Sequence, residues 1–461
     1  MSLFSTVAVL LALAALFGFI NQRLLKLPDS IGLLVTSLFA GIILVSLDPL
    51  TDGAGTRSAA DMLNKLELGD ALLNGLLAFL LFAAAIHVDL TSLWDRRWLV
   101  LALSTVGVII STVLMGAGTW MALYLLGNPL PILWCLVLGA ILSPTDPVVV
   151  AGLLKRIGLP PELEATIMGE SLFNDGVAVV LFTTLVGLAT VSGTAAFPHL
   201  GDVARTMLGE AGGGMLLGAV LGGAGLFVLR RTREYGQELV TTLALAAGSY
   251  ACALALHVSA PIAVVAAGLV ISANTAMVTT GDEAMDVQDR SSREHVRIFW
   301  TMLDHVLKAL LFLALGLSVI TLDVGRTALI AALAAIPMAV ASRFLSVALP
   351  VMAMPLALRS KGATVGLLTW GGLRGGISVA LALSVPAGPF QDALLPAAYA
   401  VTVWTIIVQG LSMNFVVKRL YPMMVEAPVT AQLSAPDSAN SDKRGDGGNT
   451  PGTALVPTGN P

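Results

Sequence analysis

Two carboxylic acids stand five positions apart in the stretch Gly169-Glu170-Ser171-Leu172-Phe173-Asn174-Asp175-Gly176, and the residues that follow it, 177–191, are largely apolar. A segment of this length and polarity is typical of a helix that crosses a membrane. A charged carboxylate near the centre of a bilayer costs at least about 2.5 kcal/mol. We therefore expect Glu170 and Asp175 to be kept there for a function.

The spacing divides the polar residues of this stretch between two helix faces. Ser171 and Asp175 are four positions apart and share one face, and Glu170 and Asn174 share the adjacent face. We expect the first pair to form a cation site together with Asp146, and the second pair to face a basic partner. The alternative is a polar clamp between helices without transport.

A second stretch, Ser143-Pro144-Thr145-Asp146-Pro147, lies in the middle of the apolar segment 131–154. Its two prolines remove backbone donors and clash with the preceding turn, so a helix should break there. A broken helix at membrane depth is tolerated where it is buried or lines a cavity, and its free carbonyls and half-helix ends bind ions in transporters. Thr145 and Asp146 are thus candidate cation ligands; alternatively they only cap the second half-helix.

Two arginines also lie inside apolar segments, and arginine cannot lose its proton. At that depth each needs a carboxylate or free backbone carbonyls. Arg374 is surrounded by glycines (Gly371-Gly372-Leu373-Arg374-Gly375-Gly376), which weaken the helix and can free backbone groups beside it. Arg343 has no such neighbours, so we pair it with Glu170; the alternative is that it snorkels to the membrane surface.

Lys308 is a further cation in an apolar segment, and Asp304 precedes it by one turn. The spacing favours a pair between these two side chains. Alternatively, Lys308 reaches Asp146 or Asp175 and changes the charge carried in each transport cycle.

The composition places these residues in an integral membrane protein. Of 461 residues, 56% are hydrophobic and 12% are charged, whereas soluble domains carry about 25% charged residues. We expect an all-α membrane protein with thirteen spanning helices, at 3–20, 31–48, 71–88, 98–126, 131–154, 164–191, 211–229, 238–256, 260–279, 298–319, 327–349, 363–385 and 393–416. No phosphate loop, nucleotide fold or zinc spacing is present, which argues against an enzyme, a cofactor or a nucleic-acid partner.

The distribution of basic residues predicts the orientation. One set of alternate connections carries sixteen Lys and Arg residues, and the other set carries only Arg57, Lys65, Arg205 and Arg326. By the positive-inside rule the first set is cytoplasmic. This puts the N-terminus outside and the C-terminus inside the plasma (inner) membrane.

The order of the segments predicts the domain organisation. Residues 1–425 form the membrane domain, with a first repeat at about 1–192, a linker helix at about 211–229 and a second repeat at about 238–418. The halves have opposite orientations and one broken helix each, as inverted repeats require. Residues 426–461 are rich in Ser, Pro, Asp, Asn and Gly, which predicts a disordered cytoplasmic tail. We read the charged stretch 281–297 as a solvated connection.

Four motifs together resemble the monovalent cation:proton antiporters, in the sodium/proton exchanger branch with an Asn-Asp pair. They are the Ser143–Pro147 and Gly169–Asp175 stretches, Gly371-Gly372-Leu373-Arg374-Gly375 and Val408-Gln409-Gly410. The resemblance covers about residues 1–420. It implies the sodium/proton antiporter fold, with inverted repeats and two broken crossing helices, in a homodimer whose mobile bundle moves against a dimerisation scaffold.

The resemblance also implies roles for individual residues. Asp175 corresponds to the carrier of cation and proton, with Thr145, Asp146 and Ser171 as further ligands of the transported Na⁺. The supporting polar groups are Glu170, Asn174, Arg343 and Arg374. Many members read Phe-Glu-Ala where this chain has Phe82-Ala83-Ala84, so one acidic group is absent. His87 and Asp89, which follow, are expected at the membrane interface.

Together these features predict a secondary transporter. Burial disfavours a charged carboxylate and a nearby cation favours it, so one buried acid can hold a proton or a metal ion in turn. We expect exchange of Na⁺, with Li⁺ and K⁺ as alternatives, for H⁺ by alternating access, with both species competing for Asp175. The alternatives are a cation channel or a transport-inactive membrane sensor on the same scaffold.

Overall fold

The protein is all-α, as expected, throughout the residues described by the computed structural model: 3–48, 54–65, 71–147, 161–191, 200–232, 234–281, 287–322, 325–354 and 360–421. The elements of the N-terminal half are α1 (Leu3–Ile20), η1 (Asn21–Leu25), α2 (Asp29–Ser46), α4 (Ala54–Lys65), η2 (Ala71–Leu76), α6 (Leu77–Ile86), α7 (Leu90–Asp95), α8 (Arg97–Ala102), η3 (Leu103–Gly107), α9 (Val108–Leu125), α10 (Ile132–Ile141) and α12 (Pro161–Val191).

The C-terminal half is also helical where it is described. Its elements are α13 (Leu200–Leu229), α14 (Tyr235–Ala255), α15 (Ala260–Gly281), α16 (Val287–Leu317), η4 (Ser318–Thr321), α17 (Arg326–Ala353), α18 (Lys361–Trp370), α19 (Gly376–Leu383), α20 (Pro389–Trp404), η5 (Thr405–Gln409) and α21 (Gly410–Leu420). Helices predominate because a membrane offers no water to satisfy backbone donors and acceptors.

Each of the thirteen predicted segments contains helix where it is described, although 131–154 is helical only over α10 and its residues after 147 lie outside the described residues. Among the described residues, nine helical stretches are long and apolar enough to cross a membrane, and three more apolar helical stretches are shorter. The integral membrane assignment therefore stands, whereas the number of thirteen crossings stays a prediction. The division into repeats and a linker also stays a prediction, and the tail 426–461 lies outside the described residues.

Two features differ from the expectations. The connection predicted at 281–297 is helical from Val287 onward, because α16 begins there. A ring contact between His295 and Tyr235, with centroids 5.3 Å apart, holds this polar part of α16 against the start of α14. Helix α4 was not among the predicted segments because it is too polar to cross a membrane.

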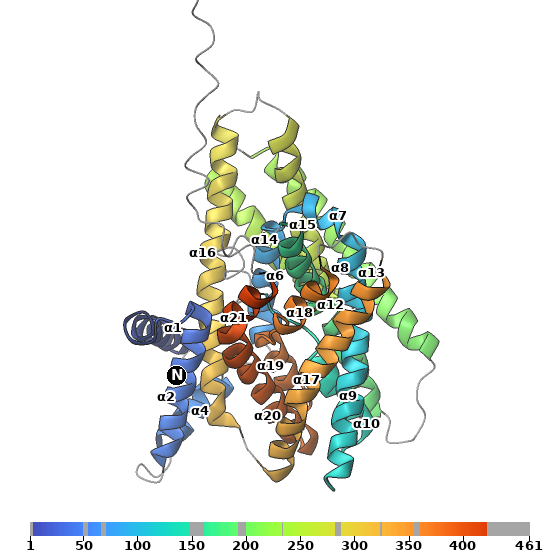
Figure 1. Cartoon of the computed structure of the whole chain (residues 1–461). Coiled ribbons are helices and arrows are strands. Elements are labelled where there is room, and N and C mark those ends of the chain that lie inside the picture. Colours follow the sequence, from blue (N-terminus) through green and yellow to red (C-terminus); the bar gives the residue numbers. More distant parts are fainter. Residues whose placement is uncertain are drawn as a thin grey trace, which may run out of the picture.

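The helices pack as two groups around separate apolar cores. One core joins α9, α10, α12, α17, α19 and α20, and we call these helices the bundle. The other core joins α6, α14, α15 and α16, and with α1, α2 and α13 we call these helices the panel. In Figure 1 the blue α1 and α2 lie beside the yellow α16. On the other side of the molecule lie α9, α10 and α17, and between the two sides lie α18 and α19. Helix α12 contributes to both cores, so it lies where the two groups meet.

Candidate cation and proton site

Both predicted helix breaks are present, and they meet. Helix α10 ends at Ile141 and is followed by the non-helical stretch 143–147, while α18 ends at Trp370 and α19 begins at Gly376. The backbone N–H of Asp146 donates to the Leu373 carbonyl at 2.8 Å, which joins the two interrupted helices directly. The prolines explain the first break, since the residue before a proline disfavours the helical conformation.

Glycine permits the close approach of the second break to its neighbours. A Cβ placed on Gly375 would overlap the side chain of Asp146, and one placed on Gly372 would overlap the side chain of Arg343. The absence of a Cβ at these two positions therefore brings a backbone segment against an acid and a base of the site.

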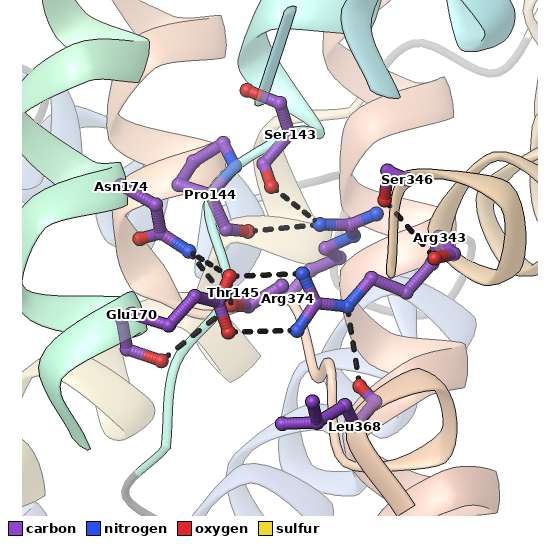
Figure 2. Close-up of polar contacts among 10 residues, drawn as sticks. Ser143, Pro144, Thr145, Glu170, Asn174, Arg343, Ser346, Leu368 and Arg374 are labelled. Atoms are coloured by element: carbon purple, nitrogen blue, oxygen red, sulfur yellow. Dashed lines mark hydrogen bonds and ion pairs between the residues drawn. The ribbon is translucent and has the colours of Figure 1, made fainter. Parts of the chain in front are cut away.

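The carboxylate of Glu170 accepts hydrogen bonds from three neighbouring side chains, as Figure 2 shows. Arg343 donates from Nη1 to Oε1 at 2.9 Å and from Nη2 to Oε2 at 2.8 Å. Asn174 Nδ2, at 2.9 Å, and Thr145 Oγ1, at 3.3 Å, also donate to Oε1. Glu170 is 1% exposed. The predicted pair of Arg343 with Glu170 is confirmed, and the two hydrogen bonds from the guanidinium are charge-assisted.

Thr145 connects the first break to helix α12. Its Oγ1 accepts a hydrogen bond from Asn174 Nδ2 at 2.8 Å and lies 3.5 Å from Ser171 Oγ. Asn174 thereby holds Thr145 and Glu170 together, while its own Oδ1 is buried without a hydrogen-bond partner in the described part of the chain. Hydroxyl and amide oxygens of three residues thus gather beside the break.

Asp175 differs from Glu170 in having no such partners. It is buried, with 8% of its surface exposed, and within the described residues its carboxylate has no hydrogen bond or ion pair. The charged groups that act on it are those of Asp146 and Glu170, both acidic. A buried carboxylate in these surroundings can be neutralised by a proton or by a metal cation.

Arg374 is buried and binds the first break. Its Nη1 donates to the carbonyl oxygens of Ser143, at 2.7 Å, and Pro144, at 3.2 Å. The prediction that Arg374 uses free backbone carbonyls is confirmed, but they belong to the other broken helix and not to the glycines around it. In a continuous helix the Ser143 carbonyl would accept from the N–H of residue 147, which is a proline, so the guanidinium supplies the missing donor.

The remaining predicted residues lie apart from this cluster. Lys308 pairs with Asp304, Nζ to Oδ2, on α16, which confirms the local pair. His87 hydrogen-bonds through Nδ1 with the Ala83 carbonyl at 2.6 Å and through Nε2 with Thr301 at 2.9 Å. Asp89 is exposed and caps α7 by accepting from the backbone N–H of Thr91.

The sequence interpretation missed one side chain of the cluster. Thr405 Oγ1 accepts a hydrogen bond from the backbone N–H of Arg374 at 3.1 Å. The signal available in the sequence was its position four residues before Gln409. Residues four positions apart lie on the same helix face, so the hydroxyl of Thr405 shares a face with Gln409.

Comparison with known proteins agrees with the fold. The family described as "Sodium/hydrogen exchanger, transmembrane" matches residues 9–419. The chain is 38% identical over 422 residues to the Na⁺/H⁺ antiporter NhaP of Pseudomonas aeruginosa, covering 90% of this chain and 96% of that protein. It is 32% identical over 404 residues to the Na⁺/H⁺ antiporter NhaH of Halobacillus dabanensis, covering 86% and 93%.

A solved structure shows the same fold. The sodium proton antiporter MjNhaP1 from Methanocaldococcus jannaschii at pH 8 superposes with a TM-score of 0.69 at 20% identity, covering 89% of this chain and 100% of that one. The family match spans both broken helices and helix α12 between them. The protein is therefore a member of the sodium/hydrogen exchanger family.

Proposed function

We propose that the protein exchanges Na⁺ for H⁺ across the membrane by alternating access, with both species sharing Asp175. The observation that carries the proposal is the contrast between two neighbouring buried acids. Glu170 accepts four hydrogen bonds, two of them from Arg343, whereas Asp175 has none within the described residues. An unpaired buried acid is neutralised by a proton or a cation, whichever is in excess.

The other oxygens of the site complete a set that suits an alkali cation. Small hard cations prefer oxygen ligands, and the broken helix supplies them from Thr145 and Asp146, next to Ser171 on α12. Asp175 and Asp146 contribute charge, and the hydroxyl groups contribute neutral ligands. Li⁺ and K⁺ share this chemistry, so the same site admits them as competing substrates.

Glu170 and Arg343 act as a fixed support. Their bidentate pair is buried and joins α12 to α17, so it holds the site helix in place without exchanging protons. Asn174 transmits this fixed position to Thr145 by donating to both Thr145 and Glu170. Arg374 holds the carbonyl oxygens of the first break.

The arrangement of helices suits a moving bundle. The site lies between the bundle and the panel, because α12 contributes to both apolar cores. Displacement of the bundle along the panel would expose Asp175 to either side of the membrane in turn. We further propose a homodimer formed through the panel, inverted repeats, and the plasma membrane as location.

Three arginines support the proposed orientation. Arg23, Arg97 and Arg231 each lie over an aromatic ring at an end of a candidate membrane span. All three belong to the predicted cytoplasmic connections. Lys and Arg are enriched in connections on the cytoplasmic side, so the ends that carry these arginines fit the cytoplasmic face.

The test compares Asp175→Asn with Asp392→Asn in proteoliposomes, measuring Na⁺-driven proton movement with a pH-sensitive dye. Asp392 is an exposed acid in the first turn of α20, away from the site. We expect the first variant to fold and lose exchange, and the second to retain it. Robust pH-dependent exchange by Asp175→Asn would overturn the proposal, and so would a large conductance or no flux from the wild-type protein.

A further inference from the structure

The second helix break is held by a side chain from a neighbouring helix. Thr405 is 2% exposed and begins the π-helical turn η5 between α20 and α21. Its Oγ1 accepts from the backbone N–H of Arg374 at 3.1 Å and donates to the Thr402 carbonyl at 2.9 Å. The hydroxyl thus uses its single proton on its own helix and offers a lone pair to the break.

The residue that Thr405 holds is also the one that joins the two breaks. The guanidinium of Arg374 binds the carbonyl oxygens of Ser143 and Pro144. The preceding residue, Leu373, accepts the backbone N–H of Asp146 at 2.8 Å. A displacement of the Arg374 backbone would therefore shift both contacts that locate the stretch from Ser143 to Asp146.

We propose that Thr405 is a positioning residue for ion exchange, which sets the place of Thr145 and Asp146 relative to Asp175 through Arg374 and Leu373. The inference rests on the proposed function of this site. Thr405 touches neither the cation nor the proton; it fixes the backbone that holds their ligands. The π-helical turn fits this role, since such turns are frequent at functional sites.

Removal of the hydroxyl has a defined consequence. In Thr405→Val the side chain keeps its shape, but the N–H of Arg374 is left buried without a partner, which is unfavourable. The break then relaxes, and the ligands at Thr145 and Asp146 lose their alignment. We expect the Na⁺ concentration for half-maximal exchange to rise roughly tenfold, with less effect on the maximal rate.

The test uses three variants in parallel. Thr405→Val removes the hydroxyl, and Thr405→Ser restores it. Thr119→Val is the matched control, because Thr119 is also fully buried in a bundle helix, α9, but its Oγ1 has no hydrogen-bond partner in the described part of the chain. We expect Thr405→Ser to lie within about twofold of the wild type, Thr119→Val to match the wild type, and only Thr405→Val to show the raised Na⁺ requirement.

A second measurement separates this inference from the proposed function. Amide hydrogen exchange on the purified protein reports the backbone around Arg374 and Asp146 without any transport. We expect amide hydrogen exchange to be faster in the peptides covering 368–376 and 142–147, and only in the Thr405→Val variant. Unchanged amide exchange there would overturn the positioning role even if transport is confirmed. The positioning role would also be overturned if Thr405→Val and Thr119→Val needed the same Na⁺ concentration for half-maximal exchange. It would be overturned likewise if that concentration rose as much in Thr405→Ser as in Thr405→Val.

Discussion

Arg343 and Glu170 lie 173 positions apart in the chain and form two parallel hydrogen bonds, 2.9 and 2.8 Å long. Both side chains are buried. The guanidinium fork fits a carboxylate in this geometry, so the pair fixes direction as well as distance. It joins α17 to α12 and occupies the carboxylate of Glu170, whereas Asp175, five residues later, has no basic partner among the described residues.

Because of this pair, we expect Glu170→Gln to lower the free energy of unfolding. The substitution leaves the charge of Arg343 buried without its counter-ion, and removal of one partner of a buried ion pair costs about 3–5 kcal/mol. We expect a clear fall in the thermal unfolding temperature in detergent. Glu210→Gln on α13 is the control, because that side chain is partly exposed and makes no ion pair among the described residues.

The double variant Glu170→Gln/Arg343→Met distinguishes two causes of instability: the loss of the ion pair itself and the burial of an unpaired guanidinium. We expect it to unfold at a higher temperature than Glu170→Gln alone, since replacing both members of a buried pair is often nearly neutral. A Glu170→Gln protein as stable as the wild type would contradict the structural role assigned to this pair.

How much of the site was predictable depends on the kind of constraint. The prolines of 143–147 and the glycines of 371–376 predicted the two breaks, because their effects are local. The partner of Arg343 followed from charge, since a buried guanidinium needs a carboxylate and Glu170 lay at a similar depth. The partners of Arg374 and Thr405 did not follow, because the carbonyl and N–H groups they bind come from elements that only tertiary packing brings together.

Gly375→Ala tests the contact between the second break and Asp146. The new Cβ would overlap the Asp146 side chain, so either the break or the acid must move. A displacement of about 1 Å at a functional group can cost about a hundredfold in rate in enzymes, and we expect a loss of exchange of at least about tenfold here. Gly362→Ala, on the same broken helix with no atom within 4 Å of an added Cβ, should exchange normally. Equal activity of the two variants would show that this close approach does not matter.

Lys308→Gln tests whether the lysine takes part in transport. Lys308 pairs with Asp304 on its own helix and is 24% exposed, and among the described residues the charged groups that act on Asp175 are the acids Asp146 and Glu170. We expect the variant to keep exchange and to change stability by less than about 1 kcal/mol, as is usual for pairs that are partly exposed. Exchange should also be insensitive to an imposed membrane potential in both proteins. A potential-dependent wild type that becomes potential-independent in Lys308→Gln would place the lysine in the transport cycle.

Competition at one acid predicts how exchange depends on pH. Protons occupy Asp175 as the pH falls, and each bound proton must leave before Na⁺ can bind. The Na⁺ concentration for half-maximal exchange should therefore rise toward acidic pH, by at most about tenfold per pH unit, the limit for one proton per site. The maximal rate at saturating Na⁺ should change far less over the same range. Dye measurements across a pH series with Na⁺ titrations at each pH give both quantities. A half-maximal concentration that stays constant while the maximal rate falls would mean that the proton binds at a different group, and the shared-site mechanism would have to be abandoned.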